Sequence, residues 1–217
     1  MRAIAEACTA LEAPIVGGNV SLYNEGASGP IYPTPVIGMV GLLPDATRAG
    51  RLGFVEEGEA IALVGPFAPS LAASELSKLR GEPLPDGLPE VEIEAVRDAQ
   101  AAVRGAVRDG LIDSAHDIAE GGIATALAEC ALAGSIGAAV EIEAGGDAWQ
   151  ACFGEAPGGF VCCGHATALA QLGERTKVTV IGKVGGDRLE IDLGSEKIEL
   201  GLDQLRERHR ALESVFQ

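Results

Sequence analysis

The residues best suited to binding chemistry lie near the start of the chain, in "GGNVSLYNE" from Gly17 to Glu25. The pair Gly17-Gly18 follows the apolar stretch "PIV", and a backbone without Cβ atoms lets a ligand approach closely. Asn19 offers an amide oxygen of the kind that Mg²⁺ accepts, and Ser21 offers a hydroxyl that can donate to a phosphate or a carbonyl. A glycine turn followed by Asn is also a common structural motif, and the pattern alone favours that structural interpretation.

A second candidate is "SAHDIAEGGIA", residues 114–124. The pattern predicts a strand that brings His116, Asp117 and Glu120 to a glycine pair where a helix begins. Backbone N–H groups at a helix start can hold an anion, but the acidic Glu120 would compete for the same place. In the structural alternative, which the pattern favours, Asp117 caps the helix and the glycines permit the turn. His116 is a possible base or ligand, without a partner that the sequence reveals.

The remaining candidates have structural interpretations. "FGEAPGGF" (153–160) is typical of a turn before a strand, and His165 is expected at a helix start. His209 lies on an apolar stripe with Leu202, Leu205 and Leu212, which predicts a packed or half-buried histidine. We find no Ser/His/Asp arrangement, phosphate-binding P-loop or dinucleotide fingerprint in the sequence.

Five cysteines form an odd set without the spacing of a metal site: Cys8, Cys130, Cys152, Cys162 and Cys163. The last two are adjacent in an expected strand, so their side chains should face opposite ways. We expect reduced structural thiols in a cytoplasmic protein, not a disulfide or a metal site.

The composition narrows the possible partners. Hydrophobic residues make up 47% of the chain, which is enough for a sizeable core, and aromatic residues only 4%. A formal net charge of −16 argues against nucleic acid or an anionic membrane as partners. Arg2 opposes four acids within residues 1–45, so this segment carries −3 and the rest −13. The lower charge would help the first segment to meet an anionic ligand, with Mg²⁺ also needed.

The acidic N-terminal helix does not resemble a signal peptide, and no apolar run approaches the roughly 20 residues of a membrane span.

The first part of the chain is expected to form a helix over 2–12 and two strands. Ile4, Cys8 and Leu11 share one helix face, "PIVGG" reads as a buried strand, and "PTPVIGMVGLL" (33–43) reads as another. So small a piece cannot bury a core alone, which suggests that Met1 is not the natural start.

The rest of the chain alternates helices and strands, which predicts an α/β layered domain after a boundary near residues 46–58. Turn residues 185–189, "GGDRL", are expected to close a hairpin between two strands. The expected strands cover 59–66, 111–118, 137–143, 178–184 and 188–193, and the expected helices cover 70–79, 90–110, 119–134 and about 202–214.

Several motifs in order resemble the synthetase subunit of phosphoribosylformylglycinamidine synthase, in the aminoimidazole ribonucleotide synthetase-like superfamily. They are "GGNVSLYNE", "PTPVIGMVGLL", "SAHDIAEGGIATALAE", "CFGEAPGGFVCCG" and "VTVIGKVGGDRLEI". The likeness runs from about residue 2 to 200, and the first motif is the most specific. "FGEAPGGF" departs from the family, where a polar residue and an Arg often replace Gly158-Gly159, so no role is carried over to that turn.

The resemblance implies an organisation. Residues 1–46 would be the tail of the second N-terminal-type, ATP-binding-like domain, and 47–217 a C-terminal-type α/β domain. Gly18 would lie at ATP, Asn19 would coordinate Mg²⁺, and Ser21 would contact the substrate. The family's catalytic histidine and most of its nucleotide and metal ligands have no counterpart here. We therefore assign no catalytic residue and expect the chain alone to be inactive.

The resemblance also implies a reaction: formylglycinamide ribonucleotide, ATP and glutamine-derived ammonia would give the formylglycinamidine, ADP and phosphate through an iminophosphate. A glutaminase subunit and a small accessory subunit would be partners, and exposed apolar surface could favour a homodimer. Two alternatives stay open: a non-catalytic structural or nucleotide-holding module, and another superfamily enzyme such as aminoimidazole ribonucleotide synthetase. No role is assigned to His116, Asp117, Glu120, Tyr23 or Asn24.

Overall fold

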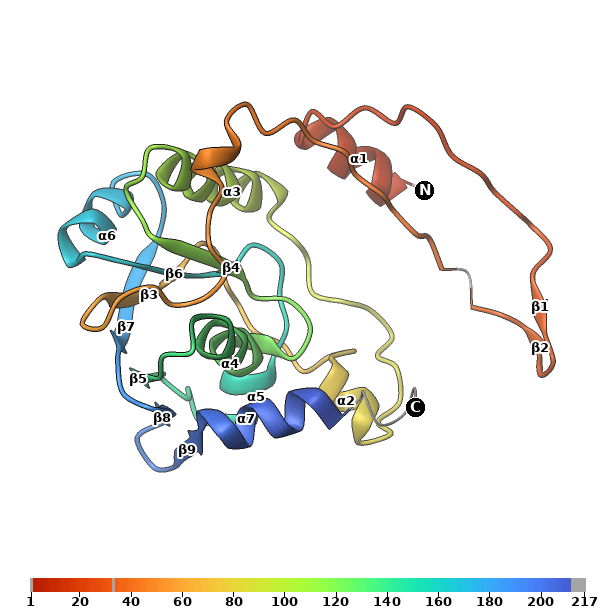
Figure 1. The fold of residues 1–217 in the computed structure, drawn as a ribbon. Helices are drawn as coiled ribbons and strands as arrows, with labels where there is room; N and C mark the ends of the chain where they lie inside the picture. Colours follow the sequence, from red (N-terminus) through yellow and green to blue (C-terminus); the bar gives the residue numbers. More distant parts are fainter. Residues whose placement is uncertain (1, 33, 212–217) are drawn as a thin grey trace. The chain divides into compact units, whose positions relative to one another are not determined.

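A computed structural model of the chain describes residues 2–32 and 34–211. The chain divides into two units, Met1–Ala46 and Thr47–Gln217. Figure 1 shows the helices and strands of both, coloured along the sequence.

The first unit has little regular structure. It contains helix α1 (Arg2–Ala10) and a two-stranded antiparallel pair, β1 (Glu25–Gly26) and β2 (Gly29–Pro30). The helix confirms most of the expected span 2–12. The two longer strands predicted at "PIVGG" and 33–43 are wrong: these residues form no strand where described, and Ile15 and Val16 are 69% and 96% exposed. A strand needs a hydrogen-bonded neighbour, and this unit's described residues offer none to these runs.

The second unit is a mixed α/β domain, which confirms the predicted fold class. Its strands are β3 (Ala60–Val64), β4 (Ser114–Asp117), β5 (Ala138–Glu141), β6 (Phe160–Gly164), β7 (Val178–Val184), β8 (Arg188–Asp192) and β9 (Lys197–Gly201). Its helices are α2 (Glu75–Leu79), α3 (Ile93–Arg108), α4 (Gly122–Gly134), α5 (Ala148–Phe153), α6 (Ala166–Leu172) and α7 (Leu202–His209), and a 3₁₀ turn spans Ala46–Arg48 at the boundary between the units. No described helix is long and apolar enough to cross a membrane.

The strands form one seven-stranded sheet in the order β4-β6-β3-β7-β5-β8-β9. All neighbouring pairs are antiparallel except β5 and β8, which are parallel. The predicted hairpin between β7 and β8 is therefore wrong, because β5 lies between them. The turn hydrogen-bonds the start of β5 instead: Gly185 N donates to Gly137 O, and Gly137 N donates to Gly186 O.

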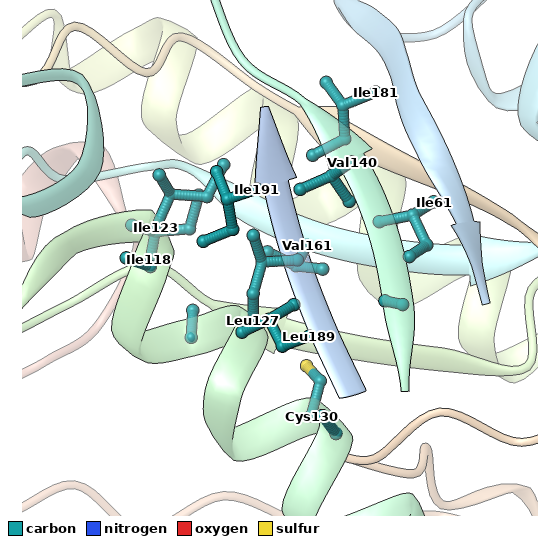
Figure 2. Packing of buried hydrophobic residues seen from close by; sticks show 14 of the residues in the cluster. Ile61, Ile118, Ile123, Leu127, Cys130, Val140, Val161, Ile181, Leu189 and Ile191 are labelled. Carbon is teal, nitrogen blue, oxygen red and sulfur yellow. The ribbon is translucent and has the colours of Figure 1, made fainter. Parts of the chain in front are cut away.

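Helices cover the sheet on both faces. Helices α3 and α6 lie on one face and α4, α5 and α7 on the other (Figure 1). Figure 2 shows Ile123, Leu127 and Cys130 of α4 packed toward Val161 and Leu189 of the sheet. Central strand β3 is apolar throughout, as expected for a strand covered on both sides.

Smaller predictions had mixed outcomes. Cys162 and Cys163 are buried in different core clusters, on opposite faces of β6 as expected, and all five cysteines are free. His165 begins α6 as expected. His209 is exposed, so the packed-histidine interpretation is wrong. The end of the predicted closing helix, with Leu212, lies outside the described residues.

Candidate functional site

The segment Gly17–Glu25 holds the three predicted ligand contacts within four residues. Gly18, Asn19 and Ser21 are all exposed. A Cβ atom built on Gly17 or Gly18 would meet nothing within 4 Å, so the backbone here is open to an approaching ligand.

Local hydrogen bonds shape the end of this segment. The Ser21 hydroxyl donates to the Tyr23 carbonyl at 3.3 Å, and the Asn24 amide donates to the Ser21 carbonyl at 2.9 Å. Asn24 thus has a structural contact, while the Asn19 side chain forms no hydrogen bond with the described residues. The roles of Gly18, Asn19 and Ser21 remain predictions.

The second candidate is the turn after β4, whose two glycines have backbone angles and close contacts that other residues could not easily adopt. Gly121 and Gly122 have φ of +80° and +69°, in the left-handed region that glycine adopts most easily. A Cβ on Gly122 would lie 2.7 Å from the carbonyl oxygens of Cys152 and Gly154, so the turn also packs closely against the C-terminal end of α5. These two constraints explain both glycines without a ligand.

Glu155 occupies the helix start that we considered for an anion. Its Oε1 accepts from Gly121 N at 2.9 Å, where α4 begins, and from Glu75 N at 2.8 Å, in the first turn of α2. The prediction that Asp117 caps α4 is wrong: Gly121 is the N-cap, and the cap has no side-chain hydrogen bond of its own. Sequence reasoning missed Glu155 because its partners are 34 and 80 residues away.

His116 has a partner that the sequence did not reveal. Its Nε2, on β4, lies 3.0 Å from Glu129 Oε2 on α4, and the His116 side chain is 11% exposed. Its Nδ1 lies 3.3 Å from Asp117 Oδ1 but outside hydrogen-bond geometry, and it has no hydrogen-bond partner among the described residues. A histidine held by a carboxylate can transfer protons, but the same contact also ties β4 to α4.

Gly158 and Gly159 have packing reasons to be glycine. A Cβ on Gly158 would lie 2.8 Å from Val96 Cγ2, and one on Gly159 would lie 2.6 Å from Phe67 Cδ2. The polar residue and Arg common in the resembled family would require these side chains to move. This is a physical reason to carry no family role over to the turn.

A buried acid lies at the opposite end of β4. Glu59 is 5% exposed, directly before β3, and it interacts with Asp113, directly before β4. Burial first, and then the hydrogen bond and charge of Asp113, raise the pKa of Glu59 to about 7. No group of three His, Cys, Asp or Glu side chains in the described part of the chain is arranged to hold a metal.

The class of protein follows from this fold and from a family match. The model of the AIR synthase related protein, C-terminal domain, matches residues 56–194, more than half of the chain. The chain belongs to this family. The resemblance stated from the motifs is thereby confirmed at the level of the family.

The particular relatives are subunits of one enzyme. PurL, the phosphoribosylformylglycinamidine synthase subunit, of Synechococcus sp. is 48% identical over 161 residues, covering 71% of this chain and 20% of that protein. PurL of Moorella thermoacetica is 37% identical over 218 residues, covering 95% of this chain and 29% of that protein. The chain thus spans less than a third of the length of these relatives.

Solved structures agree on the fold. The structure of Thermotoga maritima PurL complexed with FGAR is similar to this one, with a TM-score of 0.61 and 16% sequence identity. The match covers 74% of this chain and 30% of the Thermotoga chain. For the same protein complexed with ATP, the TM-score is 0.57 and the sequence identity 14%. That match covers 74% of this chain and 27% of the Thermotoga chain. At these identities the likeness supports the α/β fold alone.

Proposed function

We propose that this chain works as part of phosphoribosylformylglycinamidine synthase, an ATP-dependent ligase of purine synthesis. The observation that carries the proposal is the 37% identity to Moorella PurL along 95% of the chain. A likeness that reaches both units supports a shared role more strongly than the fold alone, because a fold can host many functions.

The proposed reaction explains why the residue types of the first segment suit it. An amide oxygen is a poor leaving group, so the substrate amide of formylglycinamide ribonucleotide is first phosphorylated by ATP. Ammonia then displaces phosphate from the iminophosphate. Charge accumulates on the phosphoryl oxygens during transfer, and positioned donors stabilise it. Ser21 would donate to the substrate, and Gly18 would let the backbone approach ATP. Neither residue transfers a proton, so this chain contributes binding and not the acid–base step.

Mg²⁺ would neutralise charge on the phosphates during this reaction. The exposed Asn19 suits one position in such a metal shell, because its amide oxygen is a hard ligand. One oxygen is not a complete octahedral set, so the proposal requires further oxygens from ATP and from other parts of the enzyme.

The two units would have different origins within the enzyme. We assign residues 1–46 to the tail of the second N-terminal-type, ATP-binding-like domain and 47–217 to the C-terminal-type domain. The support is the lack of a core in the first unit. None of its described residues is buried, and the apolar residues Val16, Leu22, Val36 and Val40 are almost fully exposed. Such apolar side chains need cover that this unit does not supply to itself.

The proposal includes partners that the relatives suggest. A Thermotoga structure is described as PurLQS, which supports a complex with a glutaminase subunit and a small accessory subunit. A homodimer of this chain would be an alternative way to cover its apolar side chains. A cytoplasmic location belongs to the same proposal, supported by the five free cysteines.

The sharpest test compares two asparagines in the full-length enzyme that contains this chain. Asn19→Ala should raise the Mg²⁺ concentration needed for half-maximal activity. Asn24→Ala should not, because among the described residues the Asn24 side chain bonds only the Ser21 carbonyl of its own segment. Ser21→Ala should raise the KM for formylglycinamide ribonucleotide without that metal effect. Equal Mg²⁺ dependence in both Asn variants would remove Asn19 from the metal shell.

The isolated chain should have no synthetase activity, because most of the required ligands lie outside it. Turnover of formylglycinamide ribonucleotide with ammonia and Mg²⁺-ATP by the 217-residue chain would contradict this expectation.

One observation favours the alternative of a non-catalytic module. Gly18, Asn19 and Ser21 all precede residues 56–194, so the matched family domain carries none of the proposed ligand contacts. If the first segment serves only for packing, Asn19→Ala and Ser21→Ala should leave kinetics unchanged and lower stability instead. The kinetic comparison above therefore separates the two proposals.

A further inference from the structure

A cavity of about 330 Å³ lies within the second unit, at the C-terminal end of α3. Its walls are the segment Thr47–Arg51, the last turn of α3 and the residues that precede β4. Three of the lining residues are arginines: Arg48, Arg51 and Arg108. In a chain of net charge −16 with only 16 Lys and Arg, such a concentration of basic side chains around one cavity needs a reason.

Two acids line the same cavity and reduce its positive charge. Asp109 Oδ2 lies 3.9 Å from Arg175 Nη1, whereas Asp113 hydrogen-bonds the buried Glu59, an acid that cannot neutralise it. By contrast, neither Arg51 nor Arg108 has a carboxylate within 4.0 Å in the described part of the chain. Two guanidinium groups are therefore without a negative partner at this cavity, although the protein has an excess of acids.

Regular structure holds the arginines in place. Arg48 Nη1 donates to the Arg108 carbonyl at 3.0 Å, which ties the segment to the end of α3. The Arg51 carbonyl accepts from Ala115 N at 3.0 Å, which ties the same segment to β4. Gly50 lies so close to α3 that a Cβ there would be 2.9 Å from Val107 Cγ1. A helix C-terminus carries a partial negative charge that disfavours anions, and the Arg48 contact to a terminal carbonyl offsets part of it.

We propose that this cavity binds the phosphate group of a small phosphorylated molecule through Arg51 and Arg108. Arginine suits that task because its planar guanidinium can donate two parallel hydrogen bonds to phosphate oxygens. The volume lies at the small end of the range for ligand pockets, which fits a sugar phosphate or the phosphate end of a nucleotide. The proposal is independent of the ligase function, because the site uses no residue of Gly17–Glu25.

The experiment is a titration of the isotope-labelled 217-residue chain at constant ionic strength, followed by NMR. Inorganic phosphate, ribose 5-phosphate and ADP are the probes, and ribose and chloride are the controls. Saturable shifts are expected for the amides of Gly50 and Gly110 and not for those of Gly145 and Gly194, which lie in turns outside the cavity. Tighter binding of ribose 5-phosphate or ADP than of inorganic phosphate would identify an organic ligand, and equal binding would identify phosphate alone; either supports the site.

Matched variants test the arginines. Arg51→Gln and Arg108→Gln should each weaken binding about tenfold, the size expected for one charge-assisted contact. Arg97→Gln makes the same charge change on α3, where the guanidinium lies 2.9 Å from Asp98, and should leave the affinity unchanged. Equal weakening in all three variants, or shifts that chloride reproduces, would overturn the proposal. If Arg108→Gln does not fold, Arg51→Gln and the wild-type shifts decide the question.

Discussion

Glu59 is the residue whose titration should most affect stability. Burial and Asp113 raise its pKa from 4.5 to about 7, so the folded state holds the proton more tightly than the unfolded state. The stability from this group is fully present below about pH 4.5 and is lost as pH rises toward 7. Glu59→Gln, which mimics the protonated form, should therefore be more stable than wild type by about 1–3 kcal/mol at pH 8 and equal to it near pH 4.5.

Urea unfolding at several pH values measures this difference. Glu57→Gln is the matched control, because Glu57 is exposed and two residues away. It removes the same charge and should preserve the wild-type pH dependence. Parallel profiles for Glu59→Gln and wild type would show that Glu59 ionises normally in the folded protein.

Glu155 should stabilise the domain by joining two helix starts. Glu155→Ala removes the acceptor for Gly121 N and Glu75 N, and a lost charged hydrogen bond of this kind costs about 1–3 kcal/mol. Glu155→Gln keeps an acceptor oxygen and should lose less. Glu120→Ala is the control: it removes an exposed acid beside the same helix start, so only a smaller helix-dipole effect is expected. Equal unfolding midpoints for Glu155→Ala and Glu120→Ala would show that the two hydrogen bonds of Glu155 do not stabilise these helix starts.

At the scale of elements, the insertion of β5 between β7 and β8 depends on Gly137. A Cβ there would lie 2.6 Å from Arg188 N and collide with Arg188 O, at the start of the neighbouring parallel strand. Gly137→Ala should therefore cost at least about 2 kcal/mol of unfolding free energy. Gly87→Ala is a suitable control, because a Cβ on Gly87 meets no atom within 4 Å. A similar unfolding midpoint for both variants would show that this edge of the sheet tolerates a wider spacing.

The same region shows how far periodicity predicts structure. Alternation identified β5, β7 and β8 because Val140, Val184 and Leu189 each face the core. It could not identify their neighbours, since pairing depends on contacts distant in sequence. Gly185 and Gly186 do form a turn between β7 and β8. The two strands do not pair with each other, however, because β5 lies between them and pairs with both. Strand β9 was missed although Lys197-Ile198-Glu199-Leu200 alternates polar and apolar residues. The alternating run is short, and Leu200 is 38% exposed, so the strand has no strongly apolar face.

The contacts at the second candidate could not be predicted from the sequence for a similar reason. Residue type and local spacing singled out His116 and the Gly121-Gly122 turn, and the structure gives both a defined geometry. The contacts to Glu129 and Glu155 join residues from separate elements, so the sequence pattern could not show them. For Gly18, Asn19 and Ser21, the predicted roles came from the family resemblance and not from spacing.

At the scale of the whole molecule, the two units should differ in resistance to proteolysis. Apolar side chains such as Tyr23, Tyr32 and Leu42 are 77%, 80% and 87% exposed, and no described residue of the first unit is buried. Proteolysis requires accessible backbone with little protecting structure. Brief chymotrypsin treatment should therefore cut between residues 20 and 44 first, leaving a product that retains the seven-stranded sheet.

Mass spectrometry and circular dichroism of that product test the division. Its urea midpoint should match that of the intact chain, because every described residue of the two buried core clusters lies at Phe54 or beyond. Addition of the rest of a longer PurL-type chain, or formation of a dimer, would cover the apolar residues and should slow the early cuts. The intact 217-residue chain at low concentration provides the uncovered reference. Resistance of residues 20–44 there, with first cuts inside the second unit, would show that the first unit is already protected.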